Sequence, residues 1–241
     1  MTISVITVCY NAAAELEQTM LSVLEQTHPD VEYIVIDGGS VDGSVDIIRK
    51  YADKLAYWIS EPDRGIYDAM NKGIAHATGQ YVNFMNVGDR VVSSTVLEQF
   101  AAEVAGLETC PTILYGNTYK HNAKRRWEDL SHQPEVLKHH GAFCHQSAFV
   151  SVPYHQAHPF DLHFKYMADF NFFHKAYMSG ATFWKLNLFV AEYNQEFGAS
   201  LSQISQNYKE LDEILADTDT PYRRIRRKVK HALGQLKRLI H

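Results

Sequence analysis

The sequence predicts an α/β protein built on one Rossmann-like sheet, mixed but mainly parallel, with helices flanking it. Two short runs near the start, residues 3–8 and 33–36, are almost continuously apolar, as expected of parallel strands covered on both faces. A segment with apolar residues at helical spacing separates them, and strand and helix patterns alternate again between residues 55 and 85. The 241 residues fit one large domain of this class.

The first strand is expected to end at Tyr10 and Asn11. Asn11 is predicted to be the N-cap of a helix over residues 12–27, whose apolar stripe would face the sheet. The second strand then enters a turn at residues 37–44, DGGSVDGS, whose glycines predict a tight turn. The glycine spacing matches neither G-x-G-x-x-G nor a G-K-[ST] phosphate loop, so the turn alone leaves nucleotide binding open.

The stretch over residues 60–89, SEPDRGIYDAMNKGIAHATGQYVNFMNVGD, is predicted to form a loop, a helix and a buried strand. A third strand over 55–61 precedes it. Apolar residues at positions 66, 70, 74 and 77 fall at helical spacing, and Gly79 is expected to end the helix in a left-handed conformation. The strand over 81–85 ends in the polar cluster 86–89. Because ligands bind beyond the carboxyl ends of strands in such sheets, we expect the chemistry at this cluster.

The second half of the chain carries weaker signals. A helix over 94–105 and a strand over 113–116 are predicted, followed by two strands within 183–193 broken at Asn187, and a helix over 200–217. Nine histidines fall between His121 and His174, but no H-E-x-x-H or paired Cys/His spacing favours zinc over ordinary hydrogen-bonded histidines. Asp169 opens a further predicted helix, where an acid favours the helix dipole or performs chemistry.

Composition excludes several classes of protein. No run approaches 18 apolar residues, and the start MTISVITVCYN has no basic n-region or cleavage site, so neither a membrane span nor a signal peptide is expected. The three cysteines, at positions 9, 110 and 144, include no close pair, which favours a reducing cytosol over a disulfide framework.

The last 21 residues differ from the rest of the chain. Residues 221–241 contain eight Lys and Arg and no acid, although the whole chain has a net charge of −5. Seven apolar residues there share one helical stripe, which predicts a basic amphipathic helix suited to an anionic membrane surface. Packing against the acidic body or a second subunit is the competing interpretation. Nucleic acid is not an expected partner, because the rest of the chain is acidic and has no nucleic-acid motif.

The motifs SEPDRGIYDAMNKGI, ATG and FMNVGD resemble the central segment of family 2 glycosyltransferases, most of all bacterial exopolysaccharide enzymes of the colanic-acid type. The resemblance extends from Ile3 to about Ser202 and implies a GT-A fold. It also implies a polar cluster, at the end of the strand, that holds Mg²⁺ or Mn²⁺ under a nucleotide diphosphate. Asp89 keeps a carboxylate in this cluster, whereas Asn86 and Gly88 stand where many relatives have acids.

The resemblance assigns roles to individual residues. Asp89 would bind the metal ion and Asp169 would be the general base. His145 and Gln146, in the segment CHQSAFV, would line the acceptor sugar pocket. The donor nucleotide sugar would be bound by Val8, Tyr10, Asp37, Arg64, Lys72 and Asn86.

The implied activity is inverting transfer of a sugar from a UDP- or GDP-sugar to a hydroxyl of a growing, lipid-linked bacterial surface glycan. The enzyme would lie on the inner face of the cell membrane, with a donor half in residues 1–117, an acceptor half in 118–220 and the tail helix in 221–241. A catalytically weak or inactive glycosyltransferase-like binding protein is the main alternative, because of Asn86 and Gly88. A sugar-phosphate nucleotidyltransferase is less favoured, because CYNAAAELE follows the first strand where that class needs a glycine-rich loop.

Overall fold

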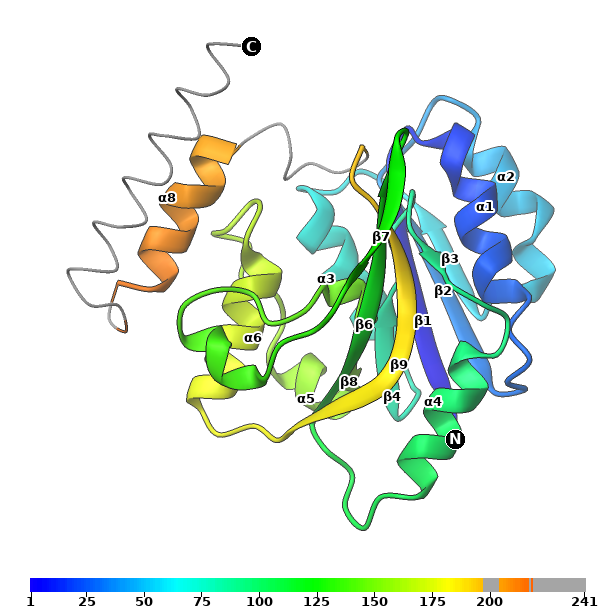
Figure 1. The fold of residues 1–241 in the computed structure, drawn as a ribbon. Coiled ribbons are helices and arrows are strands. Elements are labelled where there is room, and N and C mark those ends of the chain that lie inside the picture. Colours follow the sequence, from blue (N-terminus) through cyan, green and yellow to red (C-terminus); the bar gives the residue numbers. More distant parts are fainter. Residues whose placement is uncertain (197–203, 217, 219–241) are drawn as a thin grey trace.

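The computed structural model describes residues 1–196, 204–216 and 218. They form a nine-stranded sheet with helices on both faces (Figure 1). The predicted helix over 221–241 lies outside the described residues. Among those that are described, no helix has both the length and the apolar character needed to cross a membrane.

The first half of the chain builds a parallel unit. The strands β1 (Ile3–Cys9), β2 (Val31–Asp37), β3 (Tyr57–Ser60) and β4 (Tyr81–Phe84) lie in the order β3-β2-β1-β4. They are joined through α1 (Ala13–Leu24), α2 (Ser44–Lys50) and α3 (Ile66–His76). All three pairings within this unit are parallel. The carboxyl ends of four strands therefore meet at one edge of the sheet.

The second half extends the same sheet beyond β4 in mixed directions. β8 (Ala148–Ser151) is antiparallel to β4 and to β6 (Ile113–Asn122), and β9 (Phe183–Asn194) is parallel to β6. β5 (Arg90–Val91) and β7 (Arg125–Asp129) pair antiparallel with β9 and β6. The helices of this half are α4 (Val96–Ala105), α5 (Val152–Ala157), α6 (Ala168–Met178) and α8 (Ile204–Ile214). The predicted mixed, mainly parallel sheet is confirmed.

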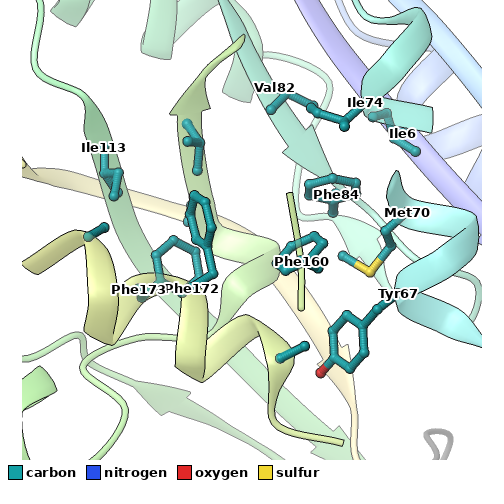
Figure 2. Close-up of a cluster of buried hydrophobic side chains, with 14 of the residues drawn as sticks. Ile6, Tyr67, Met70, Ile74, Val82, Phe84, Ile113, Phe160, Phe172 and Phe173 are labelled. Atoms are coloured by element: carbon teal, nitrogen blue, oxygen red, sulfur yellow. The ribbon is translucent and has the colours of Figure 1, made fainter. Parts of the chain in front are cut away.

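The continuous apolar runs are explained by two hydrophobic clusters, one on each face of the sheet. Ile6 and Ile34 belong to the cluster under α3, α5 and α6, whereas their neighbours Val5 and Val35 belong to the cluster under α1 and α4. Figure 2 shows the first cluster, in which Met70 of α3 faces the sheet. Successive residues of a strand point to opposite faces, so both faces of a doubly covered strand must be apolar.

Three local predictions were wrong. Asn11 does not cap α1: its φ is 46°, and its side-chain oxygen accepts a hydrogen bond from the Val41 N–H instead. Gly79 is not left-handed. A Cβ there would lie 2.6 Å from Ser4 Oγ, so glycine allows the chain to pass close to β1. Residues 183–194 form one strand rather than two, because Asn187 continues a strand that bulges in its pairing with β6.

Candidate active site

A cavity of about 440 Å³ opens beyond the carboxyl end of β4 and is walled by segments from both halves of the chain. The turn after β4 supplies Asn86, Val87 and Asp89, and α3 supplies Ile66 and Tyr67. The second half supplies the remaining walls: Lys120, residues 141–146, the start of α6 with Asp169, and the end of β9. The predicted location of the chemistry therefore coincides with a cavity.

Asp89 lies in this cavity as a buried carboxylate with no cation paired to it among the described residues. Its side chain accepts hydrogen bonds from Gln146 Nε2 at 2.7 Å and from the Asn194 N–H at 3.1 Å. Burial raises the pKa of Asp89 to about 6 despite these two hydrogen bonds. A positive ion bound beside Asp89 would offset the cost of this buried charge.

The backbone of the turn that carries Asp89 favours glycine at position 88. Gly88 has a φ of 96°, a conformation that an aspartate adopts only with strain. Asn86 is buried, and its side-chain oxygen has no hydrogen-bond partner among the described residues. An unpaired amide oxygen and a carboxylate are hard ligands of the kind that Mg²⁺ and Mn²⁺ take. These two residues therefore fit a divalent cation, although no cluster of three His, Cys, Asp or Glu in the described part of the chain does.

Asp169 stands at the start of α6 and lines the same cavity as the β4 turn. Its Oδ1 accepts a hydrogen bond from Tyr67 Oη at 2.8 Å, and its Oδ2 lies 3.1 Å from His145 Nδ1. Burial would raise the pKa of Asp169, but the hydrogen bonds from His145 and Tyr67 outweigh it and hold the pKa below its ordinary value. Asp169 is thus an ionised carboxylate at neutral pH, able to accept a proton from a ligand in the cavity.

His145 and Gln146, which were predicted to line the acceptor sugar pocket, both line this cavity, and their side chains contact residues of the predicted metal and base sites. His145 Nε2 lies 3.3 Å from Asn86 Nδ2, so the imidazole joins Asn86 to Asp169. Gln146 is buried and donates to Asp89. The structure therefore places Gln146 beside the predicted metal ligand and His145 beside the predicted base.

Apart from Asn86, the residues predicted to hold the nucleotide lie outside the cavity wall. Val8 is buried in β1, and Tyr10 is 63% exposed at the end of that strand. Asp37 is fully buried and accepts hydrogen bonds from Ser40, Ser60 and the Gly39 N–H. Burial opposes the charge of Asp37, but these bonds lower its pKa, so its carboxylate fixes the turn after β2.

An acid that the sequence pattern missed lies beside this turn. A Cβ on Gly38 would come within 2.5 Å of Asp63 Oδ2 and 3.2 Å of Tyr10 Cδ2. Asp63 thus occupies the space where the family often has a second acid after the first. Nothing in the local sequence indicates this, because the two residues are brought together only by the pairing of β2 and β3.

The two predicted phosphate-binding cations are paired with acids instead. Arg64 Nη2 lies 2.6 Å from Asp68 Oδ1, and Lys72 Nζ lies 2.7 Å from Glu61 Oε1. The lysine that reaches the cavity wall from β6 is Lys120, which pairs with an acid of β7 at 2.8 Å. Lys120 lies far in sequence from every recognised motif, so no sequence signal identified it.

Comparison with known proteins shows which family the chain belongs to. The sequence profile described as "Glycosyl transferase family 2" matches residues 4–177. The chain belongs to this family. A PGL/p-HBAD biosynthesis glycosyltransferase of Mycobacterium bovis is 28% identical over 210 residues, which cover 85% of this chain and 81% of that protein. A cholesterol galactosyltransferase of Borreliella burgdorferi is 39% identical over 98 residues, covering 40% of this chain and 27% of that protein.

Two solved structures show the fold of this family 2 glycosyltransferase. TarS from S. aureus in complex with UDP-GlcNAc has a TM-score of 0.70 at 17% identity, over 94% of this chain and 69% of TarS. The mannosyltransferase PcManGT from Pyrobaculum calidifontis, in complex with GDP-Man and Mn²⁺, has a TM-score of 0.67 at 20% identity, over 92% of this chain and 66% of that one. The expected GT-A fold is confirmed.

Proposed function

We propose that this family 2 glycosyltransferase moves a sugar from a nucleotide-diphosphate sugar to a hydroxyl with inversion of the anomeric carbon. The observation that carries the proposal is the carboxyl group of Asp169, held by two hydrogen bonds in the same cavity as Asp89 and Asn86. A base and a cation-binding pair in one cavity are the groups that such a transfer needs. TarS with UDP-GlcNAc and PcManGT with GDP-Man support a UDP- or GDP-sugar as donor.

In the proposed mechanism, Asp169 accepts the proton of the acceptor hydroxyl. The oxygen of that hydroxyl forms the new bond to the anomeric carbon, while the bond from this carbon to the diphosphate oxygen breaks on the opposite face. Asp89 and Asn86 would hold Mg²⁺ or Mn²⁺, which supplies positive charge for the departing diphosphate. Gln146 fixes the carboxylate of Asp89 through its hydrogen bond.

We assign donor binding to residues 1–117 and acceptor binding to residues 118–220, since both segments wall the cavity. Exposed Tyr10 would lie against the base, next to Asp63, whereas Val8 and Asp37 would act by shaping this surface. Arg64 and Lys72 would have to leave their acid partners to reach a diphosphate. Lys120 already lines the cavity, with its ammonium group paired to an acid of β7.

The proposed acceptor is a lipid-linked bacterial surface glycan, presented at the inner face of the cell membrane. Apolar side chains lie next to the base in the cavity wall, among them Met167, Phe170 and Phe173, which suits an acceptor with an apolar part. The Borreliella burgdorferi relative is named a cholesterol galactosyltransferase, and an apolar alcohol as its acceptor supports this part of the proposal. The basic residues 221–241 would bring the enzyme to the membrane.

The proposal is tested by screening nucleotide sugars for release of nucleoside diphosphate, measured by mass spectrometry with Mn²⁺ and with a chelator. Asp169→Asn is expected to bind donor normally and to transfer sugar about 10² to 10⁴ times more slowly. Asp89→Ala is expected to lose metal-dependent affinity for nucleoside diphosphate in calorimetry. Asp46→Asn, which changes an acid whose side chain is 81% exposed, is the matched control and is expected to leave both unchanged.

Transfer at the wild-type rate by Asp169→Asn would contradict the assignment of the base. Donor binding without release of nucleoside diphosphate, under every condition, would support the alternative of an inactive glycosyltransferase-like binding protein.

A further inference from the structure

His145 occupies a place that neither acceptor binding nor metal binding explains. It stands at the start of a short 3-10 helix before β8, with its side chain only 18% exposed. One ring nitrogen faces the base and the other faces the turn after β4. The imidazole therefore connects the two walls of the cavity that carry the proposed chemistry.

We propose that His145 is a positioning residue: its Nδ1–H holds the carboxylate of Asp169, and Asn86 fixes the ring by donating to Nε2. The inference rests on the proposed function, because it takes Asp169 as the base. Through His145, the turn after β4, where donor and cation would bind, is connected directly to the base on α6.

The carboxylate of Asp169 is held at both oxygens. Tyr67 Oη is 2.8 Å from Oδ1, and His145 Nδ1 is 3.1 Å from Oδ2. Tyr67 comes from α3, whose inner face packs in the cluster of Figure 2, where the hydroxyl of Tyr67 lies at the margin of the packed rings. Two donors from separate elements restrict the rotation of one carboxylate, so removing either one frees the base to turn away from the acceptor.

The hydrogen-bond partners determine which nitrogen of a neutral His145 carries the hydrogen. An ionised carboxylate only accepts hydrogen bonds, so the hydrogen must be on Nδ1. Nε2 is then an acceptor, which matches the Asn86 Nδ2 group at 3.3 Å. If Asn86 presented its oxygen instead, both ring nitrogens would face acceptors, and a neutral imidazole has a single N–H.

When Nδ2 of Asn86 points to His145, the side-chain oxygen of Asn86 points away from it. The surroundings of that oxygen therefore decide whether Asn86 keeps this orientation. That oxygen is buried and has no partner within the described part of the chain. A ligand with positive charge or a hydroxyl at this oxygen would favour the orientation in which Nδ2 points to His145. Occupation of the donor side thereby favours the tautomer of His145 that holds Asp169.

The kinetic test uses three variants of the full-length enzyme. His145→Asn places an amide N–H near the position of Nδ1, whereas His145→Gln places one near Nε2, and His145→Ala removes both. We expect kcat to fall about 10²-fold in His145→Ala and His145→Gln, with most of the loss restored in His145→Asn. The donor KM is expected to change less than about threefold. Equal kcat values for the Asn and Gln variants would overturn the role of Nδ1.

A second readout needs no turnover. A long-range ¹H–¹⁵N spectrum of the metal-free full-length protein reports the tautomer of each histidine, and the signals lost in His145→Asn identify His145. We expect the Nδ1–H tautomer in the wild type and a loss of that preference in Asp169→Ala, where no carboxylate remains to accept a hydrogen bond from Nδ1. An Nε2–H tautomer in the wild type would overturn the inference even in an active enzyme. Full activity of Asp169→Asn, with the expected tautomer present, would instead overturn the proposed function.

Discussion

His155 is a buried histidine that the structure uses as an aromatic ring. It is 1% exposed, stacks on Phe172 at 4.3 Å, and also contacts Phe160 and Phe84. Neither of its ring nitrogens has a hydrogen-bond partner among the described residues. Burial lowers the pKa of His155 to about 4, since a charged ring would lose its hydration here.

This environment predicts an acid-labile contribution to stability. Between about pH 6.5 and 4, the unfolded chain takes up a proton at His155 that the folded chain does not. The free energy of unfolding therefore falls as the pH falls, by about 3 kcal/mol over this range. His155→Phe is expected to remove this loss and to match or exceed the wild type at pH 7, because two unpaired buried nitrogens disappear. Urea unfolding of the metal-free protein at several pH values measures both effects.

Asp89 contributes with the opposite sign in the same range. Its folded pKa of about 6 lies above its unfolded value, so stability falls as the pH rises from about 4 to 6. The two effects oppose each other in the wild type, and His155→Phe should expose the Asp89 effect as stability that decreases with rising pH. His158→Phe changes an exposed ring stacked on Tyr154 and is the control. An unchanged pH profile in His155→Phe would refute the prediction.

At the scale of single residues, the sequence could place Asp89 and Asp169 in the candidate site, because each stands at the end or start of a predicted element within a motif that resembles the family. It could not identify Tyr67 as a partner of Asp169, since 102 positions separate them. The link from Gln146 to Asp89 spans 57 positions and depends on β8 lying next to β4. Contacts of this kind are fixed by strand pairing, which a local pattern does not contain.

The element that holds the base-bearing helix in place is α8. Glu210 of α8 is buried, and its carboxylate accepts hydrogen bonds from the N–H groups of Lys165, Tyr166 and Met167, at 3.0 to 3.2 Å. These residues lead directly into α6 and Asp169. One carboxylate thus satisfies three backbone donors just before a helix begins, where such donors have no partner within the helix.

We expect Glu210→Ala to destabilise the fold by about 3 kcal/mol and to lower kcat, because three backbone N–H groups lose their acceptor and the start of α6 loosens. Hydrogen exchange of the amides at 165–167, together with urea unfolding, measures the effect. Glu213→Ala removes an exposed acid paired with His163 and should change stability by less than about 0.5 kcal/mol. Equal protection of these amides in both variants would contradict an anchoring role of α8.

The sequence predicted elements best where their apolar pattern was longest. The strands of the first half and α3 were predicted within a few residues, because two covered faces demand continuous apolar runs and a helix demands a stripe. The single strand β9 was missed, since its register shifts near Asn117 and its polar positions resemble a break. The role of Gly79 was missed because close packing on β1, rather than a turn, requires glycine.

At the scale of the whole molecule, the parallel half followed from the order of strands and helices, whereas the mixed half did not. β8 inserts between β4 and β6 although it follows both in sequence. Apolar residues show that a strand is buried but not which neighbour it pairs with. The cavity lies between these two halves. The sequence predicted only the side of the cavity formed by the β4 turn, because it did not predict how the second half pairs with the first.

Residues 221–241 lie outside the described part of the chain, and the membrane role of this segment stays a prediction. It holds eight cations and seven apolar residues at helical spacing, and no acid. Each cation near an anionic surface contributes about 1 kcal/mol, an attraction screened over about 8 Å at physiological ionic strength. Packing of this segment on the body or on a second subunit would need no lipid.

We therefore expect the full-length protein to co-sediment with anionic liposomes strongly at low salt, more weakly at high salt, and not at all after truncation following Thr220. Replacing Arg226, Arg227, Lys228 and Lys230 with Gln keeps the apolar stripe and should weaken binding in proportion to the lost charge, which separates headgroup attraction from apolar burial. Neutral liposomes are the lipid control. If the full-length protein ignores anionic liposomes, or if the truncated protein unfolds, the segment belongs to the body of the protein or to a contact between subunits.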